Sequence, residues 1–333
     1  MKNRRLQKGC LSLRTLGVFL SVTLFILGMG REAPCAVKPS TLIWGSASLG
    51  AAGYVIIEAL TSSLNRNEKS FRNASISTQG STENLVLLSQ KEIHLGQTTS
   101  SDLYLAYHGM KPFQKKVDFT QVLSYTYWAL PIGVPQNSPV KKVEELGGKR
   151  VSMGPAGGAT VALWQSVFDA YGIKITPVYL PWQGAADALK IGQIDAVTIL
   201  QLMGNTPIPA FEELRLSSPY RLMDTHIDKI KSVSEKNPGI LVTKVTSTEP
   251  HLNAPGYSGI LVADPDLDEE MVYKICSTLY SREETVRKIA KELEFFRLEN
   301  ALKMVIPQYP IHKGAARFYK EKGIWKEGLV VSK

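Results

Sequence analysis

The sequence predicts an α/β protein built from two similar lobes, and two observations support this fold class. The order strand, small-residue loop, helix, strand, helix and strand occurs twice, first from residue 42 and again from residue 149. Such alternation favours parallel sheets with helices on both faces. Hydrophobic residues make up 44% of the 333-residue chain, which is enough apolar material to fill one large or two medium domains.

The first copy opens with Leu42–Trp44, three apolar residues that indicate a short buried strand. The loop Gly45–Gly50 consists mostly of small residues, and Ile57, Leu60 and Leu64 then recur at the spacing of an amphipathic helix. Backbone N–H groups at a helix start are unpaired, so this loop is suited to bind an anion, although a plain tight turn would look the same. The elements expected next are a strand over 73–77, a helix over 82–90 and a strand over 93–97.

The second copy has the same layout. A strand over 149–153 leads into the loop Gly154–Thr160 and then into a helix that Gly172 ends. Ligands of such sheets bind at the carboxyl ends of the strands, so two facing lobes would bring both loops to one cleft. The helix carries Val161, Trp164, Phe168 and Tyr171 on its apolar face, and a strand over 176–180, a helix over 185–190 and a strand over 194–200 are expected after it.

The segment after Asp264 is expected to be helical, over 269–281 and over 283–304. No low-complexity linker precedes it, so we expect it to pack onto a lobe. The apolar face of its first helix consists of Val272, Ile275, Cys276 and Leu279.

Residues 1–35 have the composition of a secretory signal peptide. Five basic residues precede the uncharged segment Thr15–Gly30, and Ala33-Pro34-Cys35 offers a cleavage site. The segment is short for a membrane anchor, and Arg31 and Glu32 disfavour a lipoprotein signal at Cys35. We therefore expect cleavage near Cys35 and a periplasmic mature protein. The basic residues are Lys2, Arg4, Arg5, Lys8 and Arg14.

Composition excludes several classes of function. Without residues 1–35 the chain keeps 33 Lys and Arg against 29 Asp and Glu, a net charge of +4 with no basic stripe, so no nucleic-acid partner is expected. Cys276 is then the single cysteine, which leaves no internal disulfide. The P-loop, GxSxG, GxGxxG and HExxH motifs are missing, so we expect no enzyme, no cofactor and no metal. A hydrolase assembled from scattered residues stays the enzymatic alternative.

Five stretches of sequence occur in a recognisable order along nearly the whole mature chain. They are GSASLGAAGY from Gly45, GSTENLVLLSQKEIHLGQTTSSD from Gly80, VEELGGKRVSMGPAGGAT from Val143, IGQIDAVTIL from Ile191 and PIHKGAARFYKEKGIW from Pro310. Together they resemble the TAXI solute receptors, the substrate-binding subunits of one branch of the tripartite ATP-independent periplasmic (TRAP) transporters. Two positions depart from the family pattern: Gly53 replaces an aromatic residue, and Gly158 stands where the second loop often has a serine.

The resemblance implies a bilobal periplasmic-binding-protein architecture of the type II-like, Venus-flytrap kind, with a C-terminal helical segment. Residues 36–130 plus 258–333 would form lobe 1, and residues 131–257 would form lobe 2. The monomeric receptor would capture a small organic anion, a carboxylate such as a dicarboxylate or an acidic amino acid, and deliver it to the TRAP membrane subunits. A periplasmic receptor of a signalling system, without transport, is the alternative.

Candidate ligand-binding residues of the first copy are Ser46, Ser48, Tyr54, Asn84 and Gln97. The serines could bind a carboxylate or cap the helix, and Tyr54 could close over a ligand or pack in the core. Asn84 lies early in a helix, an unfavourable place for its type unless the amide is used, and the matching family residue lies at the cleft. Gln97 ends a strand, where its side chain leaves the sheet for the cleft or starts an ordinary loop.

Candidates of the second copy are Gly157, Gly158, Thr160 and Gln201. The glycines would let a ligand approach the backbone, and Thr160 could cap its helix or reach the solute. Gln201 follows a strand as the counterpart of Gln97. Neither loop contains an arginine, so backbone N–H groups, hydroxyls and amides would have to bind the anion.

Overall fold

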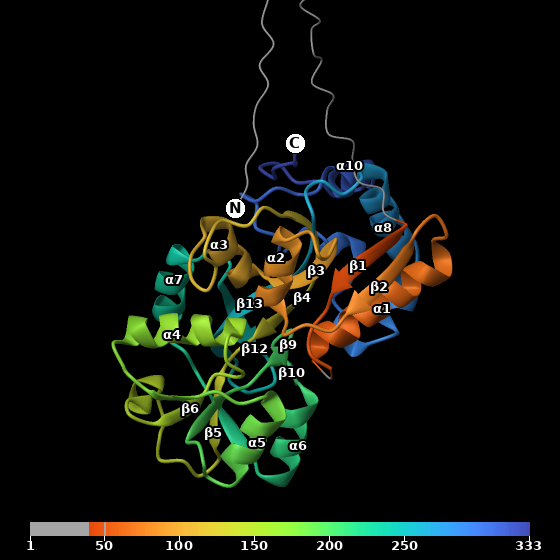
Figure 1. Ribbon diagram of the computed structural model, residues 1–333. Helices are drawn as coiled ribbons and strands as arrows, with labels where there is room; N and C mark the ends of the chain where they lie inside the picture. Colours follow the sequence, from red (N-terminus) through yellow and green to blue (C-terminus); the bar gives the residue numbers. More distant parts are fainter. Residues whose placement is uncertain (1–39, 50) are drawn as a thin grey trace, which may run out of the picture. The chain divides into compact units, whose positions relative to one another are not determined.

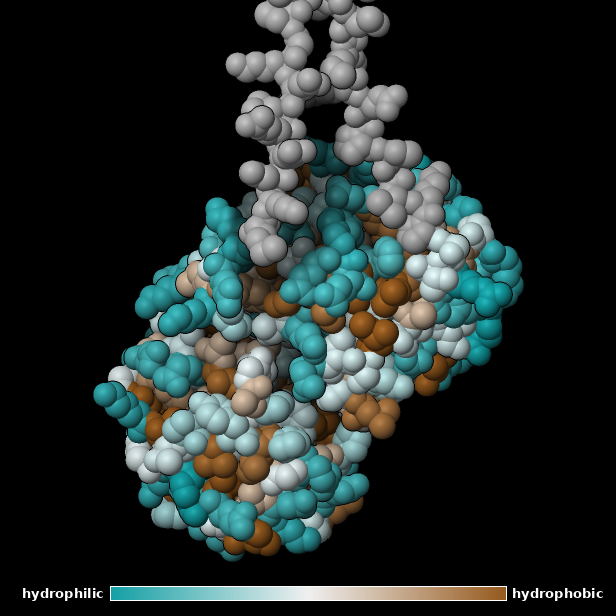
Figure 2. All heavy atoms as spheres, in the orientation of Figure 1, coloured by the Kyte–Doolittle hydropathy of each residue, from teal (hydrophilic) through white to brown (hydrophobic). Residues whose placement is uncertain are grey.

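The computed structural model describes residues 40–49 and 51–333, within a compact unit that spans Ala36–Lys333. The predicted signal peptide, residues 1–35, lies outside the described residues. None of the helices in the described ranges has the length and hydropathy of a membrane span. Hydrophilic side chains cover much of the displayed face, with hydrophobic residues interspersed among them (Figure 2).

The larger sheet of the described chain has eight strands in the order β10-β9-β4-β13-β3-β1-β2, and β12 also pairs with β13 (Figure 1). Strand β1 is parallel to β2 and β3, whereas β13 is antiparallel to β3, β4 and β12. The strands are β1 (Thr41–Gly45), β2 (Arg72–Ile76), β3 (Leu95–Thr99), β4 (Thr120–Ala129), β9 (Gln201–Leu202), β10 (Thr206–Pro207), β12 (Leu241–Val245) and β13 (Leu252–Ala263).

The smaller sheet has five strands among the described residues, in the order β11-β5-β8-β6-β7. Strand β6 is parallel to β7 and β8, and β5 is antiparallel to β8 and β11. These strands are β5 (Ile132–Pro135), β6 (Arg150–Ser152), β7 (Thr176–Val178), β8 (Ala196–Thr198) and β11 (Tyr220–Met223).

Helices connect these strands. Those of the first half are α1 (Ala52–Asn67), α2 (Ser81–Ser89), α3 (Ser100–His108) and the 3₁₀ turn η1 (Val143–Leu146). The middle of the chain forms α4 (Ala159–Tyr171), α5 (Trp182–Lys190), α6 (Pro209–Ser217) and α7 (Ile227–Lys236), and the last part forms α8 (Glu269–Ser281), α9 (Glu283–Arg287), η2 (Lys291–Leu293), η3 (Leu298–Asn300) and α10 (Lys313–Glu321).

The repeated layout predicted from the sequence is confirmed as β1-α1-β2-α2-β3 and β6-α4-β7-α5-β8. Its helices bury the expected apolar faces: Ile57, Leu60 and Leu64 of α1 are fully buried, as are Trp164 and Phe168 of α4. Each copy is a parallel three-stranded unit, but antiparallel strands extend both sheets. The expectation of parallel sheets is therefore correct for the repeated units and wrong for the sheets as a whole.

Residues 131–257 supply all five strands of the smaller sheet and also β9, β10 and β12 of the larger one. The chain therefore passes from one sheet to the other more than once in each direction. The lobe limits expected from the sequence, 36–130 plus 258–333 and 131–257, remain a prediction.

The helix expected over 283–304 is wrong. Helix α9 ends at Arg287, and η2, η3 and turns follow it. Side chains satisfy the backbone of this segment in place of helical hydrogen bonds: Leu298 N donates to Glu283 Oε2 at 2.7 Å, and Asn300 Nδ2 donates to Phe295 O at 2.9 Å. Such local pairs compete with a continuous helix, and apolar periodicity alone does not reveal them.

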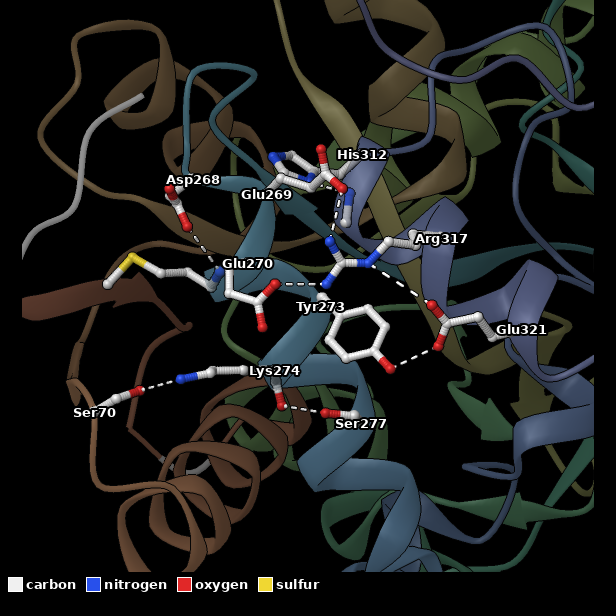
Figure 3. A network of polar contacts seen from close by, with 12 residues as sticks. Ser70, Asp268, Glu269, Glu270, Tyr273, Lys274, Ser277, His312, Arg317 and Glu321 are labelled. Carbon is white, nitrogen blue, oxygen red and sulfur yellow. Dashed lines mark hydrogen bonds and ion pairs between the residues drawn. The ribbon is translucent and has the colours of Figure 1, made fainter. Parts of the chain in front are cut away.

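Helices α8 and α10 pack against each other, and Arg317 of α10 binds acidic and aromatic side chains of α8 (Figure 3). Arg317 binds Glu269 at 2.9 Å and Glu270 at 2.6 Å, and its guanidinium lies 4.0 Å from the centre of the Tyr273 ring. Gly314 allows this close approach, because a Cβ at that position would lie 2.1 Å from Glu269 O. The C-terminal sequence motif therefore has a packing role.

His312 of the same motif is fully buried and begins α10. Its Nδ1 accepts a hydrogen bond from Gly314 N at 3.2 Å, so the proton sits on Nε2, which donates to Leu267 O at 3.0 Å. Burial lowers the pKa of His312 from 6.5 to about 4. The unfolded chain therefore binds a proton more readily than the folded chain between these two pH values.

The neutral form of His312 should make stability depend on pH. Its contribution is fully present above pH 6.5 and is lost as pH falls from 6.5 to 4, by about 3 kcal/mol in total. His312→Asn should remove this component of the slope, as measured by urea unfolding at several pH values. The exposed His108, replaced by Asn, serves as the control. Equal slopes in wild type and His312→Asn would contradict the assignment.

Candidate functional site

The loop after β1 is fixed by side chains beneath it. The carbonyl oxygen of Ser46 accepts hydrogen bonds from Asn84 Nδ2 at 2.7 Å, Gln97 Nε2 at 3.0 Å and Thr78 Oγ1 at 3.0 Å. Ser46 is itself fully buried, and its hydroxyl donates to Ile76 O at 2.7 Å. The predicted site residue Ser46 thus joins the ends of β1 and β2.

Asn84 and Gln97 lie together below this loop. The expectation that Gln97 ends its strand is wrong, because β3 runs from Leu95 to Thr99 and Gln97 pairs with Leu261 in its middle. The Asn84 amide also donates to Gln97 O at 2.8 Å, and Gln97 Oε1 accepts the Tyr125 hydroxyl at 3.1 Å. Gly45 leaves room for this amide, since a Cβ there would lie 2.3 Å from Asn84 Oδ1. Both amides therefore make hydrogen bonds inside the protein, and their predicted contact with a solute remains a prediction.

Ser48 and Tyr54 have a different environment. Ser48 is exposed and Tyr54 is half-buried, and neither side chain makes a hydrogen bond to another described residue. The N-cap position of α1 is Ala51, with no side-chain cap bond in the described chain, so the alternative that a serine caps this helix does not apply. These two polar groups are therefore available to a ligand.

The loop before α4 is tied down on one side and open on the other. Thr160 is buried, and its hydroxyl donates to Met153 O at 2.6 Å, which links the helix to the end of β6. Gly157 has a φ of +76°, a conformation that favours glycine, and Gly158 is the N-cap residue of α4. No described side chain caps this helix start, so backbone N–H groups of its first turn are left for another acceptor.

A cavity of about 920 Å³ lies between α2, α3 and α4, and we call it the α2–α4 cavity. It contains the predicted residues Gly157 and Gly158, and Thr82 Oγ1 of α2 donates to Gly157 O at 3.5 Å across one side. The other predicted residues are not among its lining. The lining consists of Thr82, Asp102, Lys111, Pro112, Phe113, Gln114, Gly157, Gly158, Val161, Ala162, Gln165 and Tyr179.

Gln201 lies elsewhere. It is 2% exposed and lines a second cavity of about 880 Å³, the β9–β11 cavity, where its Oε1 accepts Ser247 Oγ at 3.2 Å. Strand β8 ends at Thr198, and Gln201 belongs to β9, which pairs with β4 in the larger sheet. For this reason the symmetry with Gln97 does not bring both amides to one cavity, and a role of Gln201 in solute binding remains a prediction.

Asp102 lines the cavity but is not among the residues predicted from the sequence. It lies in the first turn of α3, is 2% exposed, and lines the α2–α4 cavity. Its Oδ2 accepts the hydroxyls of Ser81 at 2.5 Å and Thr82 at 3.1 Å. A usable signal was present, because Thr99 and Asp102 have the spacing of a capping box, and Thr99 Oγ1 accepts Asp102 N at 3.2 Å.

The surroundings of Asp102 are poor in compensating charge. Burial raises its pKa, while the two hydroxyls act in the opposite direction. Tyr257 lies close by, since its own pKa is raised first by burial and then by the charge of Asp102. No basic side chain in the described part of the chain forms an ion pair with this carboxylate. Likewise, residues 40–49 and 51–333 contain no group of three His, Cys, Asp or Glu that could hold a metal ion.

The two sheets and the cavity beside α4 define a class, and comparisons with solved structures agree with it: the fold is that of bilobal periplasmic binding proteins. MatC from Rhodopseudomonas palustris with bound malate aligns with a TM-score of 0.53 and 15% identity over 81% of this chain and 92% of that chain. A structure described as a periplasmic transporter aligns with a TM-score of 0.51 and 19% identity over 77% and 88%. A Xanthomonas citri protein bound to chloride ion aligns with a TM-score of 0.51 and 12% identity over 85% and 96%.

Residues 44–323 match the NMT1-like family, and the chain belongs to it. The match extends from β1 to just beyond α10, so both sheets and the α2–α4 cavity fall within it. The fold class expected from the sequence is thereby confirmed.

Asn84 offers a direct test of how the loop after β1 is held. Asn84→Ala leaves the buried carbonyls of Ser46 and Gln97 without this donor, so we expect the free energy of unfolding to fall by about 1–3 kcal/mol. Asn67→Ala, which removes a similar hydrogen bond at the exposed end of α1, should change it by at most about 0.5 kcal/mol. Urea unfolding of both variants measures the difference, and equal effects would contradict the special role of Asn84.

Proposed function

We propose that this protein is the extracytoplasmic solute-binding subunit of a TRAP transporter. It captures a small organic anion, a carboxylate or an acidic amino acid, and delivers it to the membrane permease. The observation that carries the proposal is the α2–α4 cavity, which has the start of α4 on one side and residues of α2 and α3 on the other. A protein of this fold class would enclose a solute between the first repeated unit, which contains α2, and the second, which contains α4.

The anionic character of the solute rests on two features of this cavity. The first turn of α4 has no side-chain cap among the described residues, and Gly157 and Gly158 expose its backbone. A helix N-terminus attracts anions through its free N–H groups and its dipole. Lys111 adds a positive charge to the lining. We propose Gly157, Gly158 and Lys111 as the groups that bind a carboxylate of the solute.

The remaining predicted residues take two roles in the proposal. Ser48 and Tyr54 have polar groups with no hydrogen bond to another described side chain, but they do not line the α2–α4 cavity, so their contact with the solute stays a prediction. Asn84, Gln97 and Thr160 make internal hydrogen bonds that hold the two loops in place. Micromolar affinity requires about 8 kcal/mol, more than one helix N-terminus or one hydrogen bond supplies, so several groups must act together.

Delivery to TRAP membrane subunits is supported by the five sequence stretches that resemble TAXI receptors. A receptor for a signalling system would use the same site, so the two functions are separated in cells rather than by binding. Loss of solute uptake after deletion of the gene supports transport. Normal uptake with a lost transcriptional response to the solute would favour the sensor.

A thermal-shift screen tests the class of solute. We expect a carboxylate to raise the melting temperature of the purified protein, because a ligand stabilises the folded state by RT ln(1 + [L]/Kd). The panel contains dicarboxylates, acidic and neutral amino acids, sugars and amines. Stabilisation by a sugar or by an amine, with all carboxylates inactive, would contradict the proposal.

Recovery of the bound compound unchanged, by mass spectrometry, tests the expectation that the protein performs no chemistry.

Lys111 should contribute to carboxylate binding. Lys111→Gln is expected to weaken the affinity for the identified acid about two- to fivefold, the modest effect of an exposed ion pair. Lys115→Gln removes an exposed lysine of the same loop that does not line the cavity, and it should leave the affinity unchanged. Isothermal titration measures both. Equal affinities of wild type and Lys111→Gln would remove Lys111 from the site.

A further inference from the structure

Asp102 is an acidic group within a cavity that otherwise suits an anion. It is 2% exposed, so its carboxylate is largely removed from water, yet it belongs to the cavity lining. The Ser81 and Thr82 hydroxyls both bind Oδ2, and Oδ1 has no donor among the described residues. One oxygen of a buried carboxylate is therefore left for a partner that this part of the chain does not provide.

A buried carboxylate is costly unless hydrogen bonds, a proton or a cation compensate it. The Ser81 and Thr82 hydroxyls and the first turn of α3 do so in part, which leaves Oδ1 for a cation. Lys111 lines the same cavity but forms no ion pair with Asp102 in the described structure. An anionic solute without a positive group would bring a second negative charge toward Asp102. A solute with an ammonium group would compensate it and donate hydrogen bonds to Oδ1.

The rest of the lining fits a molecule with opposite charges at separate points. Gly157, Gly158 and Lys111 provide the groups that favour a carboxylate, and Asp102 provides the group that favours an ammonium. Phe113 and Val161 line the cavity as well and offer apolar contact for the carbon chain between them. The cavity lining thus contains groups that favour a carboxylate and one group that favours an ammonium.

We propose that Asp102 binds the protonated amino group of the solute, so that the protein selects an acidic amino acid over the dicarboxylate of the same length. This inference rests on the proposed function, because it assumes that the α2–α4 cavity is the solute site. It decides between the two kinds of solute that the sequence left open. Asp102 is then a residue that determines specificity, held in place by Ser81 and Thr82.

The test compares matched pairs of probes by isothermal titration: L-glutamate against glutarate and L-aspartate against succinate. We expect wild-type protein to bind at least one amino acid about tenfold or more tightly than its matched dicarboxylate. Asp102→Asn should weaken binding of that amino acid about 10- to 100-fold and leave the dicarboxylate unchanged or tighter. Asp228→Asn, an exposed acid in the first turn of α7, should keep the wild-type preference.

Thr82→Val is the second variant, used in case Asp102→Asn does not fold. It removes one of the two hydroxyls that donate to Oδ2, and it should reduce the ratio of amino-acid affinity to dicarboxylate affinity about two- to tenfold. Melting temperatures of the unliganded variants establish that each is folded.

The possible results distinguish failure of the role of Asp102 from failure of the proposed function. Equal binding of an amino acid and its dicarboxylate by wild type, or a preference that survives in Asp102→Asn and in Thr82→Val, overturns the role of Asp102 and leaves the proposed function standing. If putrescine were the single compound that binds, Asp102 would stand as an ammonium site, but the proposal of an anionic solute would be overturned. Binding of sugars alone would overturn both.

Discussion

The amide of Asn84 joins the carboxyl end of β1 to the middle of β3, and the loop that follows β1 depends on it. It donates to the carbonyls of Ser46 and Gln97, at 2.7 Å and 2.8 Å, in a position closed to water. Buried carbonyl groups need such donors, so Ser46 at the start of this loop is tied to α2 and β3. Gly45 is part of the same constraint, because any side chain there would displace the amide.

The second copy of the layout solves the same problem with a hydroxyl. Thr160 binds Met153 O and thereby fixes the start of α4 against the end of β6. Its neighbours Gly157 and Gly158 are left to line the cavity, opposite the first turns of α2 and α3. In both copies, buried polar side chains hold the loop in place, and in the second copy the backbone of Gly157 and Gly158 lines the cavity. Asp102 is the exception, since it is both buried and part of the lining.

Periodicity and loop composition were sufficient to predict the repeated units, because each has a clear apolar pattern and a small-residue loop. The long antiparallel strands β4 and β13 were not predicted, since their pairing joins residues more than a hundred positions apart. A separate pairing, between β9 and β4, carries Gln201 away from the α2–α4 cavity. Asn84 was recognised as unusual for its position, but sequence does not say whether an amide faces a ligand or a carbonyl. Asp102 was overlooked because an acidic residue in the first turn of a helix is ordinary, and its burial follows from tertiary packing alone.

A crystal structure of the protein with L-glutamate or L-aspartate, whichever binds more tightly, tests the central claim most directly. The account predicts the ligand in the α2–α4 cavity, with its amino nitrogen about 3 Å from Asp102 and a carboxylate at the backbone N–H groups that begin α4. A ligand in the β9–β11 cavity beside Gln201, or one whose carboxylate rather than ammonium meets Asp102, would contradict it.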